Sequence, residues 1–482
     1  MSIFVSEDRN NALTLKMAYP EISILIYSLV LWLGLYLIGR NLTSPRLWLA
    51  GLGLVTYALS LATGTLLRFA PTADTALILA RLHWPTLFLP AILWFGAVVY
   101  VLPETIPLRN FLNRILSYTL LPVAIPFYLF SAGTNLIFDF STVPPQPGPA
   151  YLLFAALALL PLLAALILVS RAFQLRQQKK LLGLLLLVTL FFALSAGLLI
   201  FPLGLVSRFW LLLAVSIDFI SLGVVIALLD AFEEGETLLP DFIRSLDFSA
   251  SIVLIFGGLV ALTMMFSTGV TFPMLVLLLA IIAATILLQT FLLPIQALFD
   301  NITFKAFPRL RQERANLRAV ADALPRADTS TNPATFNEDE FNRLTRRALS
   351  HMGNLPRLAT SPLTRLPVID TRLVERQATD NTLERAAELK SLLTESITRL
   401  KPRDKGDFGT TEEWRHYNAL YYPYVVGLKP YSRRNEANNL DPAAREVMDW
   451  FRTYVPERTL YNWQNAAATL VANDLREGFN AH

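Results

Sequence analysis

The side chains best suited to chemistry lie within the apolar part of this sequence. Asp218 stands near the middle of a long apolar run, FWLLLAVSIDFISLGVVIALL. A carboxylate at that depth is costly and normally faces a bundle interior or a wet cavity, so Asp218 is the best candidate for a ligand contact, a proton site or a conformational latch. A protonated or hydrogen-bonded Asp that only holds helices together is an equally good interpretation. Arg81 and His83 in ARLHWP form a second polar pair, for which an Arg that snorkels to the membrane interface is the simpler explanation.

No residue pattern for catalysis, metal binding or a cofactor stands out elsewhere. The chain has no cysteine, only four histidines and no glycine-rich phosphate loop, so we expect no catalytic residue, no metal site and no cofactor. His351 in ALSHMGNLPRLATSPL loosely imitates the phosphoacceptor motif of histidine kinases. Met352 replaces the acidic residue expected there, and the spacing to Pro362 is too long. We therefore interpret His351 as an isolated, solvent-exposed histidine.

The elements that must position these residues are membrane-spanning helices. From Ile22 to Leu298 the chain is a series of apolar segments, each about as long as a bilayer is thick. Helices are expected because every backbone polar group in hydrocarbon needs an internal partner. The predicted spans are Ile22–Ile38, Leu47–Leu67, Leu82–Leu102, Ile115–Phe130, Tyr151–Val169, Leu181–Val206, Phe209–Leu229, Ser251–Ser267 and Phe272–Leu298. Trp48, Trp84, Trp94 and Trp210 lie near span ends, as interfacial anchors do.

The charges between the spans predict the orientation. Cations concentrate in alternate connections, which the positive-inside rule assigns to the cytoplasm. These connections carry Arg40 and Arg46, then Arg109 and Arg114, Arg171, Arg176, Lys179 and Lys180, Arg244, and the arginines that follow the ninth span. We therefore predict a multi-pass protein of the bacterial cytoplasmic (inner) membrane, with the N-terminus outside and the C-terminal block in the cytoplasm.

The expected organisation is all-α, with a polytopic membrane bundle of about nine helices before a small all-helical cytoplasmic domain. Residues 1–21 form an N-terminal extracytoplasmic segment that lacks the apolar core of a cleavable signal peptide. Residues 22–229 form seven spans, and 230–298 an acidic cytoplasmic loop with two further spans. The proline-rich loop Ser131–Ala150 is interpreted as a plain connector, with an extracytoplasmic cap or an interfacial segment as the alternatives.

The first seven spans resemble the N-terminal seven-helix sensor region of bacterial histidine kinases and diguanylate cyclases. The resemblance lies in LWLAGLGLVTYALSLATGTLLR, ALILARLHWPTLFLPAILWFGAVVYVL and GVVIALLDAF. It implies a signal-receiving membrane module. Here, two further helices follow the seventh span, where that family continues directly into an output domain.

Residues 299–326 are predicted to form an amphipathic juxtamembrane helix, and 327–337 a linker. The juxtamembrane arginines are candidates for binding anionic lipid head groups. They are Arg309, Arg311, Arg314 and Arg318.

The polar block 338–482 shows helical periodicity. Its expected helices are Glu338–Leu349, Thr382–Leu400, Thr411–Tyr421, Pro442–Tyr454 and Arg458–Glu477. The stretch from Arg347 to Glu477 resembles a helical regulator module of the Chloroflexota, in which a tyrosine-rich helix precedes a helix-turn-helix. The resemblance places a helix-turn-helix-like segment at 442–477 and makes five residues candidates for contacting DNA or a protein partner. They are Arg458, Thr459, Tyr461, Asn462 and Gln464.

These observations favour a non-enzymatic signal-transduction protein that couples a membrane sensor bundle to a DNA- or protein-binding domain. A structural or accessory subunit of a larger membrane complex is the first alternative, to which the tyrosines 421, 422, 424 and 431 are equally suited. A transporter centred on Asp218 is the second. The expected partners are membrane lipids, DNA as a candidate, and further copies of the chain or other membrane subunits.

Overall fold

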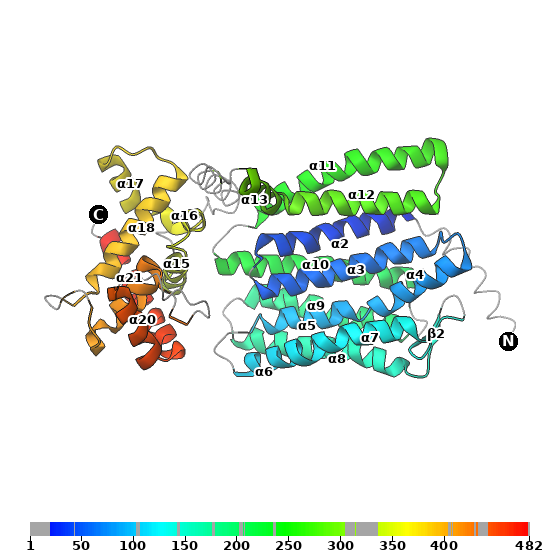
Figure 1. Cartoon of the computed structure of the whole chain (residues 1–482), viewed down its shortest axis with the longest axis horizontal. Helices are drawn as coiled ribbons and strands as arrows, with labels where there is room; N and C mark the ends of the chain where they lie inside the picture. Colours follow the sequence, from blue (N-terminus) through cyan, green and yellow to red (C-terminus); the bar gives the residue numbers. More distant parts are fainter. Residues whose placement is uncertain are drawn as a thin grey trace. The chain divides into compact units, whose positions relative to one another are not determined.

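The structure, a computed structural model, describes residues 20–42, 44–102, 107–141, 145–175, 179–201, 206, 208–234, 238–303, 314, 336–402, 406, 408–428, 430–431 and 442–480. These residues are almost entirely helical and divide into two compact units, one within 1–230 and 242–296 and the other within 231–241 and 297–482. Figure 1 shows the helices of both units with their labels.

The described part of the chain contains nine helices long and apolar enough to cross a membrane, as predicted. They are Glu21–Arg40, Pro45–Leu67, Ala73–Val99, Leu108–Gly133, Tyr151–Gln174, Lys179–Ile200, Trp210–Ala231, Leu239–Thr268 and Phe272–Thr290. In Figure 1 the long helices of this unit run in nearly the same direction. The apolar faces they expose are suited to contact with lipid.

The first seven spans are built from α2 to α10. The elements are α2 (Pro20–Arg40), α3 (Pro45–Leu67), α4 (Ala73–Thr86), α5 (Leu89–Val99), α6 (Pro107–Ile115), α7 (Leu121–Gly133), α8 (Tyr151–Leu175), α9 (Lys179–Ile200) and α10 (Arg208–Glu234). A π-helical turn, Leu116–Leu120, joins α6 to α7. Helix α3 lies at the centre of this set, since it contacts α2, α4 and α5.

Helix α2 attaches the last two spans to the others. They are α11 (Leu239–Thr263), which continues into a π-helical turn, and α12 (Phe272–Thr290); α13 (Leu292–Thr303) follows. The ring of Trp32 packs edge-on against Phe242 at 5.0 Å, and its Nε1 donates to Ser245 Oγ at 3.2 Å. Tyr27 donates to the Leu279 carbonyl of α12 at 3.2 Å.

Three spans begin earlier than predicted. The third begins at Ala73, where the Thr72 side chain caps the helix by accepting from Thr75 N at 3.2 Å. The fourth begins at Leu108 and the eighth at Leu239. An apolar run marks only the lipid-facing length of a helix, whereas the backbone hydrogen-bond ladder continues through polar turns outside it. Consequently Arg81 and His83 lie more than two turns inside their helix.

The loop that follows α7 folds back on the bundle and is not a plain connector. Residues Phe138–Asp139 (β1) and Gln146–Pro147 (β2) form a short antiparallel pair, and Gly148 N donates to Ile137 O at 2.9 Å. Ile137, Phe138 and Phe140 are buried. A pair this short is stable only when packed against other structure, which the aromatic contacts described below supply.

The second unit has an apolar core that includes Leu389, Trp414 and Phe451. Its helices are α15 (Glu338–Ser350), α16 (Leu355–Leu358), α17 (Pro367–Glu375), α18 (Thr382–Arg399), α19 (Arg415–Leu420), α20 (Pro442–Tyr454) and α21 (Glu457–Asn480); short 3₁₀ segments lie at Pro362–Arg365 and Glu412–Trp414. The predicted helix Thr411–Tyr421 is present as a 3₁₀ turn, Glu412–Trp414, that continues directly into α19, and a π-helical turn, Tyr421–Val426, follows. Asn337 and Asn381 cap α15 and α18 by accepting backbone N–H groups.

Candidate functional site

A cavity in the first unit, called the membrane unit below because it holds most of the spans, is walled by aromatic rings. It encloses about 610 Å³ of space that no atom occupies, including its open mouth. The rings belong to α3, α4, β1, α8, α9 and α10. They are Tyr57, Trp84, Phe138, Tyr151, Phe154, Phe192 and Phe219. A concave apolar site lined by aromatic rings, with few polar groups, is typical of small-molecule binding sites.

Small residues create the space between the rings. Ala91 of α5, Ala158 of α8 and Ala196 of α9 line the cavity where larger side chains would fill it. Ala91 and Ala158 are buried. The rings themselves are held by one another, with centroids 4.5 Å apart for Phe192 and Phe219. Because edge-to-face and offset contacts fix ring orientation, the wall is pre-formed.

The folded loop supplies one wall of this cavity. The Phe138 ring lies 4.9 Å from Phe154 and 5.6 Å from Tyr151, in each case edge-on. It also lies 5.9 Å from Trp84. The predicted interfacial anchors Trp84 and Trp94 therefore face protein: Trp84 lines the cavity, and Trp94 is only 2% exposed.

Polar atoms at the cavity wall are few. The Tyr57 hydroxyl lies 2.8 Å from Ser216 Oγ and 3.3 Å from the Leu212 carbonyl, and Ser216 Oγ itself lies 2.7 Å from that carbonyl. The Tyr151 hydroxyl donates to the Ile200 carbonyl at 2.9 Å. Both phenol protons are thus used within the protein.

Asp218 is half-buried on α10, and its Oδ2 accepts a hydrogen bond from Ser195 Oγ of α9 at 2.8 Å. It precedes Phe219, which lines the cavity, but its own side chain is not part of the lining. This geometry favours the interpretation of a hydrogen-bonded Asp that joins two helices. A role in ligand or proton binding stays a prediction.

Arg81 and His83 do not form one site. Arg81 donates to the Ala132 carbonyl at 2.7 Å and to Asn135 Oδ1 at 2.9 Å, and its guanidinium lies 4.9 Å from the Phe140 ring centre. It therefore fastens the folded loop and does not snorkel freely. His83 Nδ1 lies 2.8 Å from the Ser60 carbonyl oxygen, which requires that this nitrogen carries the proton.

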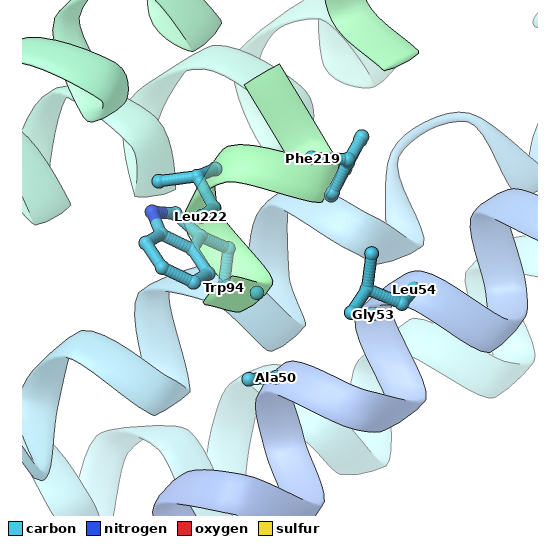
Figure 2. A pocket seen from close by; sticks show the side chains of 7 residues that line it. Ala50, Gly53, Leu54, Trp94, Phe219 and Leu222 are labelled. Carbon is cyan, nitrogen blue, oxygen red and sulfur yellow. The ribbon is translucent and has the colours of Figure 1, made fainter. Parts of the chain in front are cut away.

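A second, smaller cavity lies between α3, α5 and α10. It encloses about 210 Å³ and is apolar. Figure 2 shows Ala50, Gly53 and Leu54 of α3 opposite Phe219 and Leu222 of α10, with Trp94 of α5 beside them. Phe219 lines both cavities.

A buried charge cluster lies at the ends of α2, α3 and α10, and the sequence did not predict that its residues meet. Asp230 Oδ1 accepts from Arg46 Nη2 at 2.9 Å, and its Oδ2 accepts from Arg40 Nε at 3.4 Å. All three side chains are at most 8% exposed. One signal was present in the sequence. Asp230 in LLDAF lies near the end of the seventh span that the positive-inside rule places in the cytoplasm, on the same side as Arg40 and Arg46.

In the second unit, the five predicted contact residues lie at the start of α21 but are not equally accessible. Arg458, Tyr461 and Asn462 are exposed, whereas Thr459 and Gln464 are half-buried. The Tyr461 ring lies 4.9 Å under the guanidinium of Arg346 on α15. Gln464 donates to the Ala419 carbonyl of α19 at 3.2 Å. Two of the five thus take part in interactions within the unit.

Two other expectations change in this unit. His351 is half-buried, not solvent-exposed, because it ends α15 against the core residue Met352. Burial, with Arg347 and Arg357 nearby, lowers the pKa of His351 to about 4. The tyrosines of Tyr421–Val426 and Tyr431 pack against the core, with Tyr422 buried, which removes most of their area from a docking surface.

Arg314 is the one predicted lipid-binding arginine among the described residues. It lies 3.3 Å from Asp300 and is 49% exposed. Arg309, Arg311 and Arg318 lie outside the described residues, as does most of the predicted juxtamembrane helix.

Within the residues that the structure describes, no cluster of three or more His, Asp or Glu side chains is arranged to hold a metal ion. Comparisons with models of protein families, with curated proteins and with solved structures find no match.

Proposed function

We propose that this chain is a non-enzymatic membrane signalling protein. In this proposal, a small molecule binds in the aromatic cavity of the membrane unit, and the C-terminal helical unit passes the state of the bundle to a partner. The observation that carries the proposal is the cavity itself: an apolar space lined by seven elements of the seven-span part, α3, α4, α5, β1, α8, α9 and α10.

Helix α10 is suited to transmit a change at the cavity. Val215 and Phe219 line the cavity, and Asp230, about 16 Å further along the same helix at 1.5 Å per residue, accepts from Arg40 and Arg46. A ligand that favours one position of Phe219 would therefore bias how the α10 end docks on α2 and α3. Only a difference in affinity between two arrangements can shift their populations.

The exposed residues of the C-terminal unit support a protein partner more than DNA. On the first turns of α21, the cation Arg458 adjoins the acidic Glu457, and Tyr461 and Gln464 take part in contacts with α15 and α19. DNA-binding domains generally present a marked cationic face. The charge pattern of the connections supports a bacterial inner membrane for the spans and a cytoplasmic position for the C-terminal unit.

The test fills the cavity by substitution and measures the response of the C-terminal unit. Ala196→Phe adds a ring to the cavity wall and mimics a bound ligand, while Ala193→Phe places the same ring at a half-buried position of α9 that does not line the cavity. Hydrogen exchange of the full chain in lipid nanodiscs is then followed by mass spectrometry. We expect Ala196→Phe alone to change exchange in the peptides of α20 and α21. Identical exchange in both variants and the parent would overturn the proposal.

The alternatives give different outcomes. An accessory subunit would be purified in a fixed ratio with other membrane proteins, and its C-terminal exchange would not respond to Ala196→Phe. A transporter centred on Asp218 would lose solute uptake into vesicles on Asp218→Asn, which the signalling proposal does not require.

A further inference from the structure

We infer that the aromatic cavity takes a neutral ring compound carrying one hydrogen-bond donor, of the class of a phenol, a benzyl alcohol or an indole. The inference rests on the proposed function in that it names the ligand of the same site. Three properties of the wall carry it: its charge, its ring geometry and the direction of its hydrogen bonds.

The wall selects against charged molecules. Among the residues that line the cavity there is no carboxylate, guanidinium or ammonium. The nearby ionisable groups are engaged elsewhere, since Asp218 accepts from Ser195 and Arg81 donates to the loop after α7. An unpaired charge brought into apolar surroundings loses far more solvation than it regains. A fatty acid or an amine would therefore be excluded in its ionised form.

The wall favours flat rings over flexible chains. The Phe192 and Phe219 ring centroids lie 4.5 Å apart, and Phe138 meets Phe154 edge-on at 4.9 Å. All four rings line the cavity. A flat ring bound there can make stacked or edge contacts with them, and aromatic pairs add about 0.5 to 1.5 kcal/mol each beyond the area they bury. A rigid ring also loses little conformational entropy on binding.

The polar edge of the cavity offers an acceptor. Tyr57 donates its proton to Ser216 Oγ or to the Leu212 carbonyl, and Ser216 Oγ itself donates to that carbonyl. The Tyr57 oxygen can therefore accept a further hydrogen bond. A ligand hydroxyl or N–H can donate to this oxygen, whereas a ligand with only a carbonyl would leave its acceptor unsatisfied against it.

The probe for the test is 4-(trifluoromethyl-diazirinyl)benzyl alcohol, used on the full chain in nanodiscs. Its carboxylate analogue, the corresponding benzoate, keeps the ring and the diazirine but carries a negative charge and no hydrogen-bond donor at the ring substituent. After irradiation, labelled residues are mapped by peptide mass spectrometry, with 2-naphthol as the competitor. We expect saturable labelling of peptides that contain Tyr57, Phe154 or Phe192, lost on excess 2-naphthol, and at least about tenfold weaker labelling by the carboxylate.

Two variants separate cavity binding from partition into lipid. Ala196→Phe should reduce the saturable labelling by at least about tenfold, since it occupies the site, while Ala193→Phe should leave it unchanged. If Ala196→Phe does not give a monodisperse protein, Ala196→Leu replaces it. Labelling that does not saturate and spreads equally over lipid-facing residues of all variants would overturn the inference, as would equal labelling by the carboxylate.

The outcomes for ligand class and for signalling are distinguishable. Saturable labelling at the cavity with no effect of 2-naphthol on hydrogen exchange in α20 and α21 would uphold the ligand class and refute signalling. A C-terminal response to Ala196→Phe without saturable labelling would refute the ligand class and leave the signalling proposal standing.

Discussion

Arg46 and Asp230, far apart in the sequence, meet in a buried ion pair at 2.9 Å, and the same carboxylate also accepts from Arg40. Arg40 in addition donates to the Tyr36 hydroxyl at 3.2 Å. The cluster therefore joins α2, α3 and α10 at one end of the bundle. Because a buried carboxylate without cations is strongly disfavoured, the two arginines and Asp230 can exist there only together. The docking of the α10 end thus depends on this contact.

Asp230→Asn should destabilise the bundle. The substitution removes a carboxylate that pairs with two buried guanidinium groups, and breaking a buried pair typically costs about 3 to 5 kcal/mol. Thermal unfolding of the purified protein measures the loss. Asp74→Asn, at an exposed position in the first turn of α4, is the control and should have little effect. Equal stability of the two variants would show that the cluster does not lock α10.

Gly51→Ala should weaken the crossing of α2 and α3. A Cβ atom at Gly51 would lie 2.6 Å from the Gly34 carbonyl oxygen and 2.6 Å from Ile38 Cγ1. The backbones are thus in contact at this crossing, as small residues allow in membrane helices. We expect a loss of about 1 to 3 kcal/mol in the free energy of unfolding, typical of overpacking.

Gly258→Ala is the matched control for this substitution, since a Cβ there meets nothing within 4 Å. It should be neutral or slightly stabilising, because alanine has the higher helix propensity. Unfolding of each variant is followed by titration with SDS. Gly51→Ala should unfold at a lower SDS concentration than the parent, and Gly258→Ala at the same or a slightly higher one. Coincident curves would contradict the backbone contact.

Much of the fold was predictable because the membrane imposes one simple constraint. Helices must be apolar over the bilayer thickness, and an apolar helix lies at each of the nine predicted spans in the described residues. The ninth ends at Thr290 and not at Leu298, because the apolar run continues past it into a separate helix, α13. The helix beginnings were less predictable. The third span begins at Ala73, after its cap Thr72, and the eighth begins at Leu239. Both lie in sequence of mixed polarity, where composition gives no sharp boundary between a helix turn and a loop.

The candidate site was only partly predictable, for a different reason. Asp218 stands out because it is a charge in an apolar run. Phe138, Phe154 and Phe192 do not, because an aromatic residue that lines a cavity has the same sequence signature as one that fills a core or faces lipid. Only the three-dimensional arrangement brings these rings together around Ala158 and Ala196. The loop that carries Phe138 was interpreted as a connector for the same reason.

Ser195 and Asp218 should show a measurable coupling energy. The hydrogen bond between them joins α9 to α10 at 2.8 Å. In a double-mutant cycle with Ser195→Ala and Asp218→Leu, we expect an interaction of about 0.6 kcal/mol and at most about 1.7 kcal/mol, the range for such bonds in membrane proteins. Asp218→Asn should cost less, because its amide oxygen still accepts. Additive effects of the two substitutions would show that the contact does not hold the helices.

His351 should remain neutral in the folded protein down to about pH 4. Its pKa is lowered from 6.5 to about 4, chiefly by burial and further by Arg347 and Arg357. Between these pH values the unfolded chain binds more protons than the folded one, so stability is full above pH 6.5 and falls as the pH drops toward 4. The loss should be about 2 kcal/mol after allowance for partial exposure of the ring.

Histidine hydrogen–deuterium exchange followed by mass spectrometry reports the pKa of this side chain directly. The urea-denatured protein is the reference and should titrate near the ordinary value. In His351→Gln the pH dependence of unfolding of this unit should be shallower between pH 4 and 6.5. A native titration of His351 close to pH 6.5 would show that the ring is hydrated.

Substitutions on α21 should separate folding from recognition. Gln464→Ala removes the donor to the buried Ala419 carbonyl and should cost about 1 to 3 kcal/mol, the penalty for an unsatisfied buried acceptor. Arg458→Ala and Asn462→Ala change exposed side chains, so each should leave stability within about 0.5 kcal/mol. Thermal unfolding and gel-shift assays on the full chain, with a random DNA pool at low salt, measure both properties. If DNA is the partner, Arg458→Ala should weaken the DNA gel shift while stability is unchanged. If the partner is a protein, neither the parent nor any variant should shift the DNA.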